Sequence, residues 1–438
     1  MKFYGRNKEV ESLIEIRQRS HRHAQMTVLT GRRRVGKTRL IKESLKGELF
    51  LYFFLSRKEE PLLCAEFREQ IKQTLGIEPI GDFSRFQQVF QWLCQYSRTK
   101  HLNLVIDEFQ EFFRINSSIY SEIQHLWDSN KEEVKMNLIL SGSIQSLMRK
   151  IFESYHEPLF GRATAKLFLR PFGVNELRDL MIEHKPDALP IDLLTFYTIT
   201  GGVPKYVEYF IDQGLLKQAE FFDAFFDDRS FFLDEGKALL LDEFGKDYGT
   251  YFSILALISS GKTDRGAITS VIQRDIGGHL KRLEEDYSII RAHRPMFSKP
   301  GSRNLKFFID DNFLSFWFRF VFKYNASIEL ENYDMVIKLI NRDFSTYAGR
   351  FLEKFIRKQL AESMQFSHVG NYWQRGNQNE IDVIAYNELT KQAIIGEVKM
   401  KRENISLDVL KLKAQEVSRQ LGGYDISYQG YALEDLLT

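Results

Sequence analysis

The 438-residue sequence contains little cysteine, little proline and no long apolar run, and these shortages exclude several classes of protein. The two cysteines, Cys64 and Cys94, lack metal-ligand spacing, so the sequence predicts neither a disulfide framework nor a zinc site. No apolar stretch reaches the length of a transmembrane helix, and the first residues lack the apolar core of a signal peptide. We therefore expect a cytoplasmic protein with no membrane-spanning segment.

An excess of charge of one sign is also missing. Lys and Arg total 61 and Asp and Glu total 59, which gives a formal net charge of +2. No global field therefore marks a nucleic-acid binder, and any such contact has to come from local patches. Hydrophobic residues, by contrast, are plentiful at 43%. This content and the chain length predict roughly two to four well-packed domains.

Residues 31–38 read Gly-Arg-Arg-Arg-Val-Gly-Lys-Thr and match the phosphate-binding loop pattern G-x-x-x-x-G-K-[ST] at every fixed position. An apolar stretch at 26–30 suits a buried strand, and helical spacing follows at 39–45. A strand, loop and helix in this order present backbone N–H groups and the positive helix end to phosphates. We expect Lys37 to reach the β- and γ-phosphates and Thr38 to bind Mg²⁺, so the sequence predicts ATP or GTP binding. The other residues of this segment assigned to the nucleotide are Gly31, Arg34, Val35, Gly36 and Arg39.

Two further apolar stretches end in polar residues suited to nucleotide hydrolysis. The first ends in Asp107 and Glu108. Asp107 suits the Mg²⁺ shell, and Glu108 suits a base that orients the attacking water. The second, at 135–143, ends in Ser-Gly-Ser, so Ser141 or Ser143 could sense the γ-phosphate. A simple turn explains these serines equally well.

The order of these strands and motifs resembles the AAA+ and STAND groups of ATPases and, more narrowly, the prokaryotic archaeal ATPase family. Phe3–Val10 matches the F-x-G-R-x-x-E-[LV] box, Pro158–Arg162 matches a Gly-Arg segment, and Thr200–Tyr206 matches the G-G-[IV]-P-x-Y signature of the lid. The resemblance implies ATP as the nucleotide, its hydrolysis, and a place for Tyr4 and Arg6 near the adenine.

The same resemblance suggests roles for two cations, each with an alternative. Arg162 is either an arginine finger, in cis or from a neighbouring subunit, or a salt-bridge arginine. A finger from a neighbouring subunit would require a homo-oligomer. Lys205 is either a lid sensor or a helix-surface lysine.

The middle of the chain predicts two helical modules. Helical spacing from residue 171 to about 240 predicts a small lid, and from 241 to 330 three helices precede two strand-like stretches, which is the winged-helix plan. The loop and strands of this wing are basic and either contact DNA phosphates or pack domains together. The basic residues are Arg291, Arg294, Lys299, Arg303 and Lys306.

A second chemistry is predicted near the C-terminus. Residues 378–385 enter a strand that contains Asp382, and residues 392–399 form the next strand. Glu397 and Lys399 alternate along that strand, so both side chains project from one face. A hairpin would bring Asp382 beside them. Two carboxylates and a lysine can hold a divalent cation such as Mg²⁺ or Mn²⁺ and activate a water.

Upstream, residues 351–360 have helical spacing, and Glu353 on this helix could complete the metal shell. Helix Glu, strand Asp and then E-x-K resemble the PD-(D/E)XK nuclease superfamily, which implies a restriction-endonuclease-like α/β fold. No proline precedes Asp382, which departs from the motif. The alternatives are a surface salt-bridge cluster or a catalytically silent nuclease fold. A later helix could add a contact from Lys411, Lys413 or Gln415. The implied catalytic residues are Glu353, Asp382, Glu397 and Lys399, of which the three carboxylates bind metal.

The sequence thus predicts an α/β multidomain protein. It has an AAA+-like ATPase core with a parallel sheet at 1–170, a helical lid at 171–240, a winged helix at 241–330 and a nuclease-like domain at 335–438. The predicted function is an ATPase that couples a nucleotide switch to DNA binding and metal-dependent DNA cleavage, in defence, mobile-element work or DNA maintenance. The alternative is a STAND-like signalling or scaffold ATPase with a silent nuclease-like domain.

Overall fold

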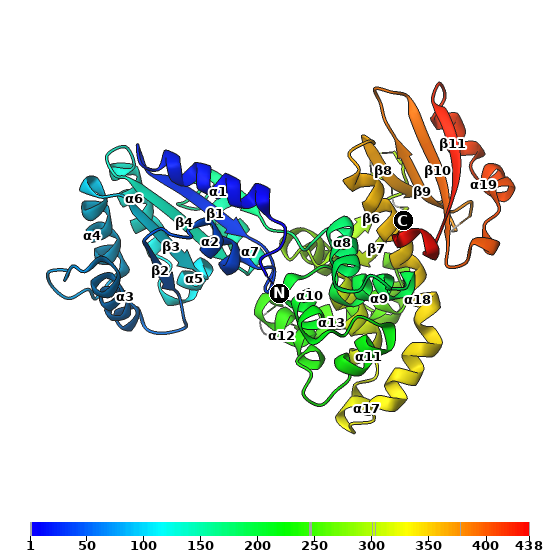
Figure 1. The fold of residues 1–438 in the computed structure, drawn as a ribbon, viewed down its shortest axis with the longest axis horizontal. Coiled ribbons are helices and arrows are strands. Elements are labelled where there is room, and N and C mark those ends of the chain that lie inside the picture. The colour runs from blue at the N-terminus through cyan, green and yellow to red at the C-terminus, as the bar shows by residue number, and fades with distance from the viewer. Residues whose placement is uncertain (1, 245–247, 300, 303, 377, 438) are drawn as a thin grey trace. The chain divides into compact units, whose positions relative to one another are not determined.

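The computed structural model describes residues 2–244, 248–299, 301–302, 304–376 and 378–437 (Figure 1). Arg303 of the predicted basic wing lies outside the described residues. The chain divides into two compact units, residues 1–170 and 171–438. Within the described ranges, no helix combines the length and the apolar composition needed to cross a bilayer.

A parallel sheet with strand order β2-β3-β4-β1-β5 forms the centre of the first unit. Its inner strands are short apolar runs with both faces buried, which is typical of parallel strands covered on both sides. β4 lies between β1 and β3 and is parallel to both, so the carboxyl ends of these three strands lie at the same edge of the sheet. The strands are β1 (Gln25–Thr30), β2 (Phe50–Phe54), β3 (Leu102–Asp107), β4 (Met136–Gly142) and β5 (Ala165–Phe168).

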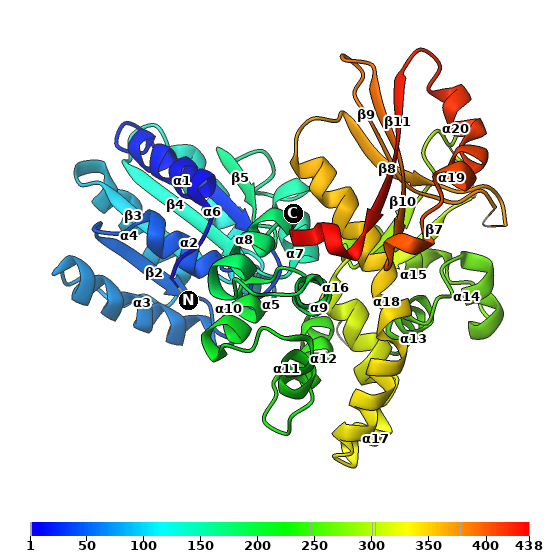
Figure 2. The same cartoon turned by 45° about the vertical axis from the view of Figure 1, so that its right-hand side comes forward.

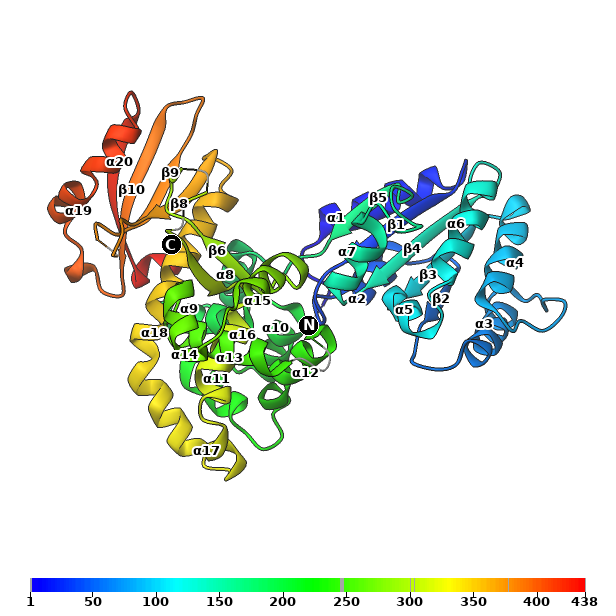
Figure 3. The ribbon, with the colours of Figure 1, turned by 180° about the vertical axis from the view of Figure 1, so that it is seen from behind.

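Helices cover both faces of this sheet (Figure 3). On one face, α1 (Asn7–Arg19) and α2 (Lys37–Ser44) bury Leu13, Leu40 and Ile41 against it. The other face carries a larger apolar core with many phenylalanines. The helices of that face are α3 (Glu60–Leu75), α4 (Phe86–Thr99), α5 (Phe112–Ile115), α6 (Ile119–Asn130) and α7 (Gln145–Glu153). The predicted α/β core with a parallel sheet is therefore confirmed.

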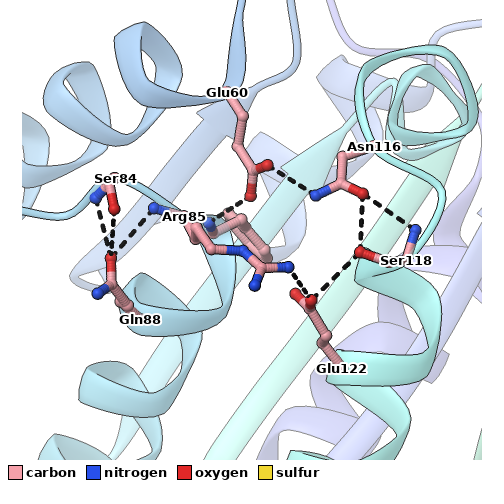
Figure 4. Close-up of polar contacts among 8 residues, drawn as sticks. Glu60, Ser84, Arg85, Gln88, Asn116, Ser118 and Glu122 are labelled. Atoms are coloured by element: carbon pink, nitrogen blue, oxygen red, sulfur yellow. Dashed lines mark hydrogen bonds and ion pairs between the residues drawn. The ribbon is translucent and has the colours of Figure 1, made fainter.

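A polar network fixes the ends of α3, α4 and α6 relative to one another (Figure 4). The Glu60 carboxylate accepts hydrogen bonds from the Phe86 backbone N–H at 2.7 Å and from the Asn116 amide at 2.7 Å. Arg85 forms an ion pair with Glu122 of α6. Because these groups satisfy one another at helix ends, the helices on this face are held by directed bonds as well as by apolar packing.

His101, which precedes β3, gives a pH-dependent prediction. Its Nε2 lies 2.8 Å from the Ser20 Oγ, and its ring stacks on His21 at 3.7 Å. Burial, reinforced by His21, lowers the pKa of His101 to about 4. The unfolded chain, with a His pKa of about 6.5, binds the proton first as pH falls. The contribution of neutral His101 to the free energy of unfolding is therefore complete above about pH 6.5 and is lost toward about pH 4.

As the pH is lowered from about 7 to about 4.5, we expect the melting temperature of wild type to fall more than that of His101→Gln. Thermal melts at several pH values test this, with exposed His23→Gln as the control. An equal fall of the melting temperature with pH in wild type and His101→Gln would contradict the prediction.

The second unit begins with helices joined by an aromatic core. Phe225 and Phe232 stack at 4.8 Å, and Phe225 meets Phe316 edge-on at 5.1 Å. These three phenylalanines are therefore core residues. The helices are α8 (Val174–His184), α9 (Pro190–Thr200), α10 (Pro204–Gln213), α11 (Gln218–Phe225), α12 (Phe232–Phe244), α13 (Tyr248–Ser259), α14 (Arg265–Ile272), α15 (Gly277–Lys281), α16 (Asn312–Phe316) and α17 (Asn325–Glu329).

The turn between α9 and α10 is made by Gly201 and Gly202, both with positive φ. A Cβ on Gly202 would lie 2.4 Å from the Phe172 carbonyl oxygen, so no larger residue fits there. Pro204 then begins α10. The Gly-Gly-Val-Pro segment is therefore a tight turn, because glycine tolerates positive φ and proline suits the first turn of a helix.

The β6 (Ile290–His293) and β7 (Lys306–Ile309) strands pair antiparallel after α13, α14 and α15. The order of three helices and a hairpin is the one the sequence predicts. Its identification as a winged helix stays a prediction.

The C-terminal part of the second unit is a mixed sheet of order β11-β10-β9-β8 (Figure 2). Its strands are β8 (His368–Tyr372), β9 (Ile381–Tyr386), β10 (Gln392–Lys399) and β11 (Asp425–Ala432). The long helix α18 (Tyr333–Glu362) contacts β8, β9 and β10. The short helices α19 (Leu407–Lys413) and α20 (Gln415–Gln420) complete the small core of this sheet.

Candidate functional site

The loop between β1 and α2 has the backbone conformation of a phosphate cradle. Gly31 has φ 154° and Gly36 has φ 93°, and Gly36 caps the N-terminus of α2. A Cβ on Gly31 would lie 2.6 Å from the Leu169 carbonyl oxygen, so only glycine fits this position. Arg34 also has positive φ, at 67°. The loop therefore turns tightly enough to direct backbone N–H groups toward an anion at the start of α2.

Lys37 lies inside this cradle and is 7% exposed. Its Nζ donates to the carbonyl oxygens of Gly31 at 2.8 Å and Arg32 at 3.2 Å. Burial lowers the pKa of Lys37 to about 8, while Glu108 and Asp107 oppose this shift. The ammonium is thus held at the loop by backbone oxygens, where it can neutralise phosphate charge.

Asp107, at the end of β3, is the centre of a small hydrogen-bond network. Its Oδ2 accepts from the Thr38 hydroxyl at 3.2 Å and from the Tyr52 hydroxyl, and its Oδ1 accepts from the Glu108 backbone N–H at 3.0 Å. Thr38 and Asp107 are therefore neighbours, as a shared Mg²⁺ would require. The hydroxyl of Thr38 and the carboxylate of Asp107 supply oxygen ligands of the kind that Mg²⁺ prefers. The ammonium of Lys37 and the backbone N–H groups of the tight glycine loop suit the nucleotide phosphates. Bound there, the metal would neutralise charge developing on the phosphates.

Tyr52 comes from β2 and was not predicted as a site residue. Its hydroxyl fixes the carboxylate of Asp107, the residue expected to bind Mg²⁺ directly or through water. Loss of such a supporting partner typically weakens metal binding by about 10–100-fold. We therefore expect Tyr52→Phe to raise the Mg²⁺ concentration needed for tight ATP binding by that factor.

The measurement is titration of a fluorescent ATP analogue at several Mg²⁺ concentrations. Tyr155→Phe removes a hydroxyl from a side chain that is 72% exposed and serves as the control. Identical Mg²⁺ dependence of wild type and Tyr52→Phe would show that the Tyr52 hydroxyl does not support the metal site.

Glu108 follows Asp107 with φ 55°, a conformation uncommon for residues other than glycine. Its Oε2 accepts from the Ser143 hydroxyl at 2.7 Å and from the Gln110 amide at 2.5 Å. Of the two serines considered, Ser143 therefore contacts the predicted base. Ser141 lies on β4, and its buried hydroxyl makes no hydrogen bond within the described part of the chain. Gln110 was missed because no motif marks it.

Four further residues predicted to contact the nucleotide lie in the first unit. Arg6 caps the start of α1, pairs with Glu9 at 3.1 Å and donates to the Arg170 carbonyl. Tyr4 is partly buried, and Val35 is buried below the loop. Arg39 is exposed on the first turn of α2.

The two cations with alternative roles each form an ion pair. Arg162 pairs with Asp128 at 2.8 Å, and Lys205 pairs with Glu208 at 3.6 Å. A role of either cation at a nucleotide stays a prediction.

The predicted basic wing makes extensive contacts with the C-terminal sheet. The Met296 backbone N–H donates to the Asn371 carbonyl at 2.9 Å, and Phe297 stacks on Tyr386 at 5.9 Å. Lys306 pairs with Glu380 at 3.5 Å. These contacts favour the packing role for Met296, Phe297 and Lys306 over a free DNA-contacting wing.

Two other cations of the wing, Arg294 and Lys299, are exposed. Arg291 pairs with Asp310 at 3.0 Å.

The predicted C-terminal site residues come together where β9 and β10 pair. The Lys399 Nζ lies 3.6 Å from the Asp382 Oδ2 and 3.2 Å from the Glu397 Oε1. Asp382 also accepts from the Val398 backbone N–H at 2.8 Å. Of the three polar residues considered on the later helix, Lys413 contacts the cluster, 3.5 Å from the Glu397 Oε1.

Glu353 of α18 is linked to this cluster through Arg357, one helical turn further on. The Arg357 guanidinium lies 3.4 Å from the Glu353 Oε2 and donates to the Asp382 carbonyl oxygen at 2.5 Å. Burial, with Asp382 adding to it, raises the pKa of Glu353 to about 7. Burial also raises the pKa of Glu397, but Lys399, Ser406 and Lys413 outweigh it and leave that pKa below its ordinary value. The carboxylates are therefore pushed toward different protonation states.

Within the described ranges, no group of three or more His, Cys, Asp or Glu side chains is arranged to hold a metal ion. The structure thus joins Asp382, Glu397 and Lys399 directly and brings in Glu353 through Arg357. Asp382 and Glu397 offer two carboxylates, which is a usual number for Mg²⁺ that keeps several waters.

Two family models match separate parts of the chain. Residues 3–210 match the family described as "ATPase domain predominantly from Archaea". Residues 317–417, which include α18 and the strands that carry Asp382 and Glu397, match a family described as "Archaea bacterial proteins of unknown function".

Three similar chains come from three different organisms. An uncharacterized protein of Methanocaldococcus jannaschii is 29% identical over 413 residues, which cover 91% of this chain and 88% of that protein. The structure of a Walker-type ATPase of Pyrococcus abyssi superposes with a TM-score of 0.54 at 19% identity, covering 72% of this chain and 96% of that one. The ORC2 protein of Aeropyrum pernix has a TM-score of 0.47 at 15% identity, with 75% and 95% covered.

The first unit and the start of the second thus contain a P-loop ATPase domain. The family match confirms the predicted ATPase core, and the Pyrococcus structure shows the same fold. The nuclease-like nature of the C-terminal domain stays a prediction.

Proposed function

We propose that this P-loop ATPase uses ATP binding and hydrolysis to control a C-terminal domain that binds DNA and cleaves it with a divalent metal ion. The observation that carries the proposal is the contact of one ammonium, that of Lys399, with the carboxylates of both Asp382 and Glu397. These three residue types, on neighbouring strands, are those needed to bind a metal ion and a phosphodiester together.

Each member of the cluster has a distinct chemical task in this proposal. Asp382 and Glu397 would hold the metal ion, with waters in its other positions. Lys399 would neutralise the charge that develops on the phosphate. Glu353, whose pKa burial raises to about 7, can hold or release a proton near neutral pH.

The experiment is a cleavage assay with the whole chain on plasmid and linear DNA. Mg²⁺ or Mn²⁺ is added with and without ATP, and wild type is compared with Glu397→Gln. Glu403→Gln removes a carboxylate that is 72% exposed and is the matched control. We expect metal-dependent cleavage in wild type and the control but not in Glu397→Gln. No cleavage by wild type under any condition, or equal cleavage by Glu397→Gln, would refute the nuclease.

A second function, a nucleotide-switched signalling or scaffold ATPase, is favoured by one observation. Lys399 and Lys413 together place two ammonium groups against Glu397, so the cluster is well satisfied as a purely structural ion network. In that case Glu397→Gln would lower the melting temperature of the C-terminal domain, and wild type would cleave neither DNA nor RNA.

A further inference from the structure

A group of basic side chains lies beside the Asp382 cluster, where Lys354 of α18 contacts Asp310, the residue that follows β7. We propose that Arg291, Lys354, Arg357 and Lys358 form a binding surface for the phosphates of a DNA backbone. This inference deepens the proposed function and rests on it, because it identifies how the substrate of that site would be held.

The geometry of the surface comes from α18 and from the strands β6 and β7. The Lys354 Nζ donates to the Asp310 carbonyl oxygen at 2.6 Å and to the Asn312 Oδ1 at 2.8 Å. The Asp310 carboxylate lies 3.0 Å from Arg291 and 3.9 Å from Lys354, so one acid is shared by two cations. Lys358, one helical turn after Lys354, lies with its Nζ 5.7 Å from the centre of the Tyr197 ring.

Three cations, Arg291, Lys354 and Lys358, surround one carboxylate, that of Asp310. Burial raises the pKa of Asp310, but Lys354, Arg291 and Lys358 outweigh it and leave the pKa below its ordinary value. Burial, with Arg357 and Arg291, also lowers the pKa of His293 to about 4. Asp310 thus does not neutralise the cations around it, and an added anion would relieve their repulsion.

The exposure of these cations suits contact with an external ligand. Lys358 is exposed, and the Arg291 side chain is 63% exposed, whereas Lys354 and Arg357 are largely covered. The two exposed cations can therefore reach a phosphate, and the guanidinium of Arg357 adds fixed positive potential behind it.

The place of this basic surface along α18, next to the proposed cleavage site, indicates that its ligand is the phosphate backbone of a polymer. Lys354 follows Glu353 directly, and Arg357 contacts both the Glu353 carboxylate and the Asp382 carbonyl oxygen. A phosphate on this surface would therefore lie next to the proposed cleavage site. Successive phosphates of one DNA strand can occupy both places together, whereas a single free phosphate would occupy only one of them.

The test measures DNA binding by the whole chain in EDTA, so that cleavage cannot interfere. Wild type is compared with the double variant Arg291→Gln/Lys358→Gln over a range of salt concentrations. Removing two phosphate contacts is expected to reduce the slope of log affinity against log salt by about two. Lys237→Gln/Lys338→Gln removes two exposed lysines elsewhere in the same unit and is expected to leave the slope unchanged. Melting curves and ATPase rates verify that both double variants are folded.

The outcomes separate this inference from the nuclease proposal. An unchanged slope in Arg291→Gln/Lys358→Gln, or no DNA binding by wild type, overturns the surface. Inorganic phosphate is also tested as a competitor of DNA. If it displaces DNA at a concentration equal to that of the DNA phosphate groups, the site takes a free anion and the inference is overturned. A reduced slope without any metal-dependent cleavage supports the surface and refutes the nuclease, while cleavage with an unchanged slope does the reverse.

Discussion

Replacing Glu108 by Gln is expected to lower the kcat of ATP hydrolysis by about 10²–10⁴-fold while ATP binding is retained, because a positioned general base contributes that much. Glu108 directly follows Asp107 at the end of β3, and its Oε2 accepts from both Ser143 and Gln110. Glutamine keeps the size of the side chain but is a poor proton acceptor. It leaves Lys37 and Thr38, the expected contacts to phosphate and metal, unchanged.

The measurement pairs steady-state hydrolysis with equilibrium binding of a fluorescent ATP analogue. Glu132→Gln, at an exposed position of the same unit, is the matched control and is expected to behave as wild type. A kcat for Glu108→Gln close to that of wild type would show that another group orients the water. Loss of ATP binding in this variant would instead mean that Glu108 supports the shape of the loop.

Replacing Phe355 by Ala is expected to lower the free energy of unfolding of the second unit by about 3–5 kcal/mol, the usual cost of removing a buried phenylalanine. Phe355 of α18 is 1% exposed and meets the ring of Tyr197 on α9 edge-on at 5.3 Å. The substitution leaves a cavity between these two helices. The same helix carries Glu353 and Lys354, so loss of its packing would also loosen both proposed C-terminal sites.

Hydrogen–deuterium exchange can follow each unit separately. Amides of α9 and α18 are expected to lose protection in Phe355→Ala, whereas those of β1, β3 and β4 keep theirs. Met364→Ala, at a side chain that is 87% exposed, should change neither. Equal loss of protection in both units would show that they unfold together, and no loss would show that the cavity closes.

Local sequence predicted the parts of the molecule that depend on neighbouring residues. The phosphate loop, the acidic end of β3 and the strand pair that contains Asp382, Glu397 and Lys399 all lie within short segments whose periodicity fixes the strand or the turn. The parallel sheet followed from apolar runs with helices between them.

Contacts between distant residues could not be predicted in this way. Tyr52 meets Asp107 because β2 and β3 pair, and nothing in the tyrosine's surroundings marks that register. The basic residue Lys306 reads as a solvent-exposed cation of a wing, yet the structure pairs it with Glu380 and places it 4.7 Å from the centre of the Trp373 ring. Which surface a charged side chain covers is decided by tertiary packing, which a single sequence does not reveal.

Helix α18 fixes the distance and the rotation about its axis between two contacts that it makes, one near Glu353 and one through Glu362. Glu353 lies beside the Asp382 cluster, and nine residues later the Glu362 carboxylate accepts the backbone N–H groups of Val174 and Asn175 at the start of α8, both at 3.1 Å. Inserting one residue between these glutamates would turn one of them by about 100° and shift it by about 1.5 Å, which would break one of the two contacts. Chains that share this architecture are therefore expected to vary in the length of their loops but to keep this spacing of nine residues.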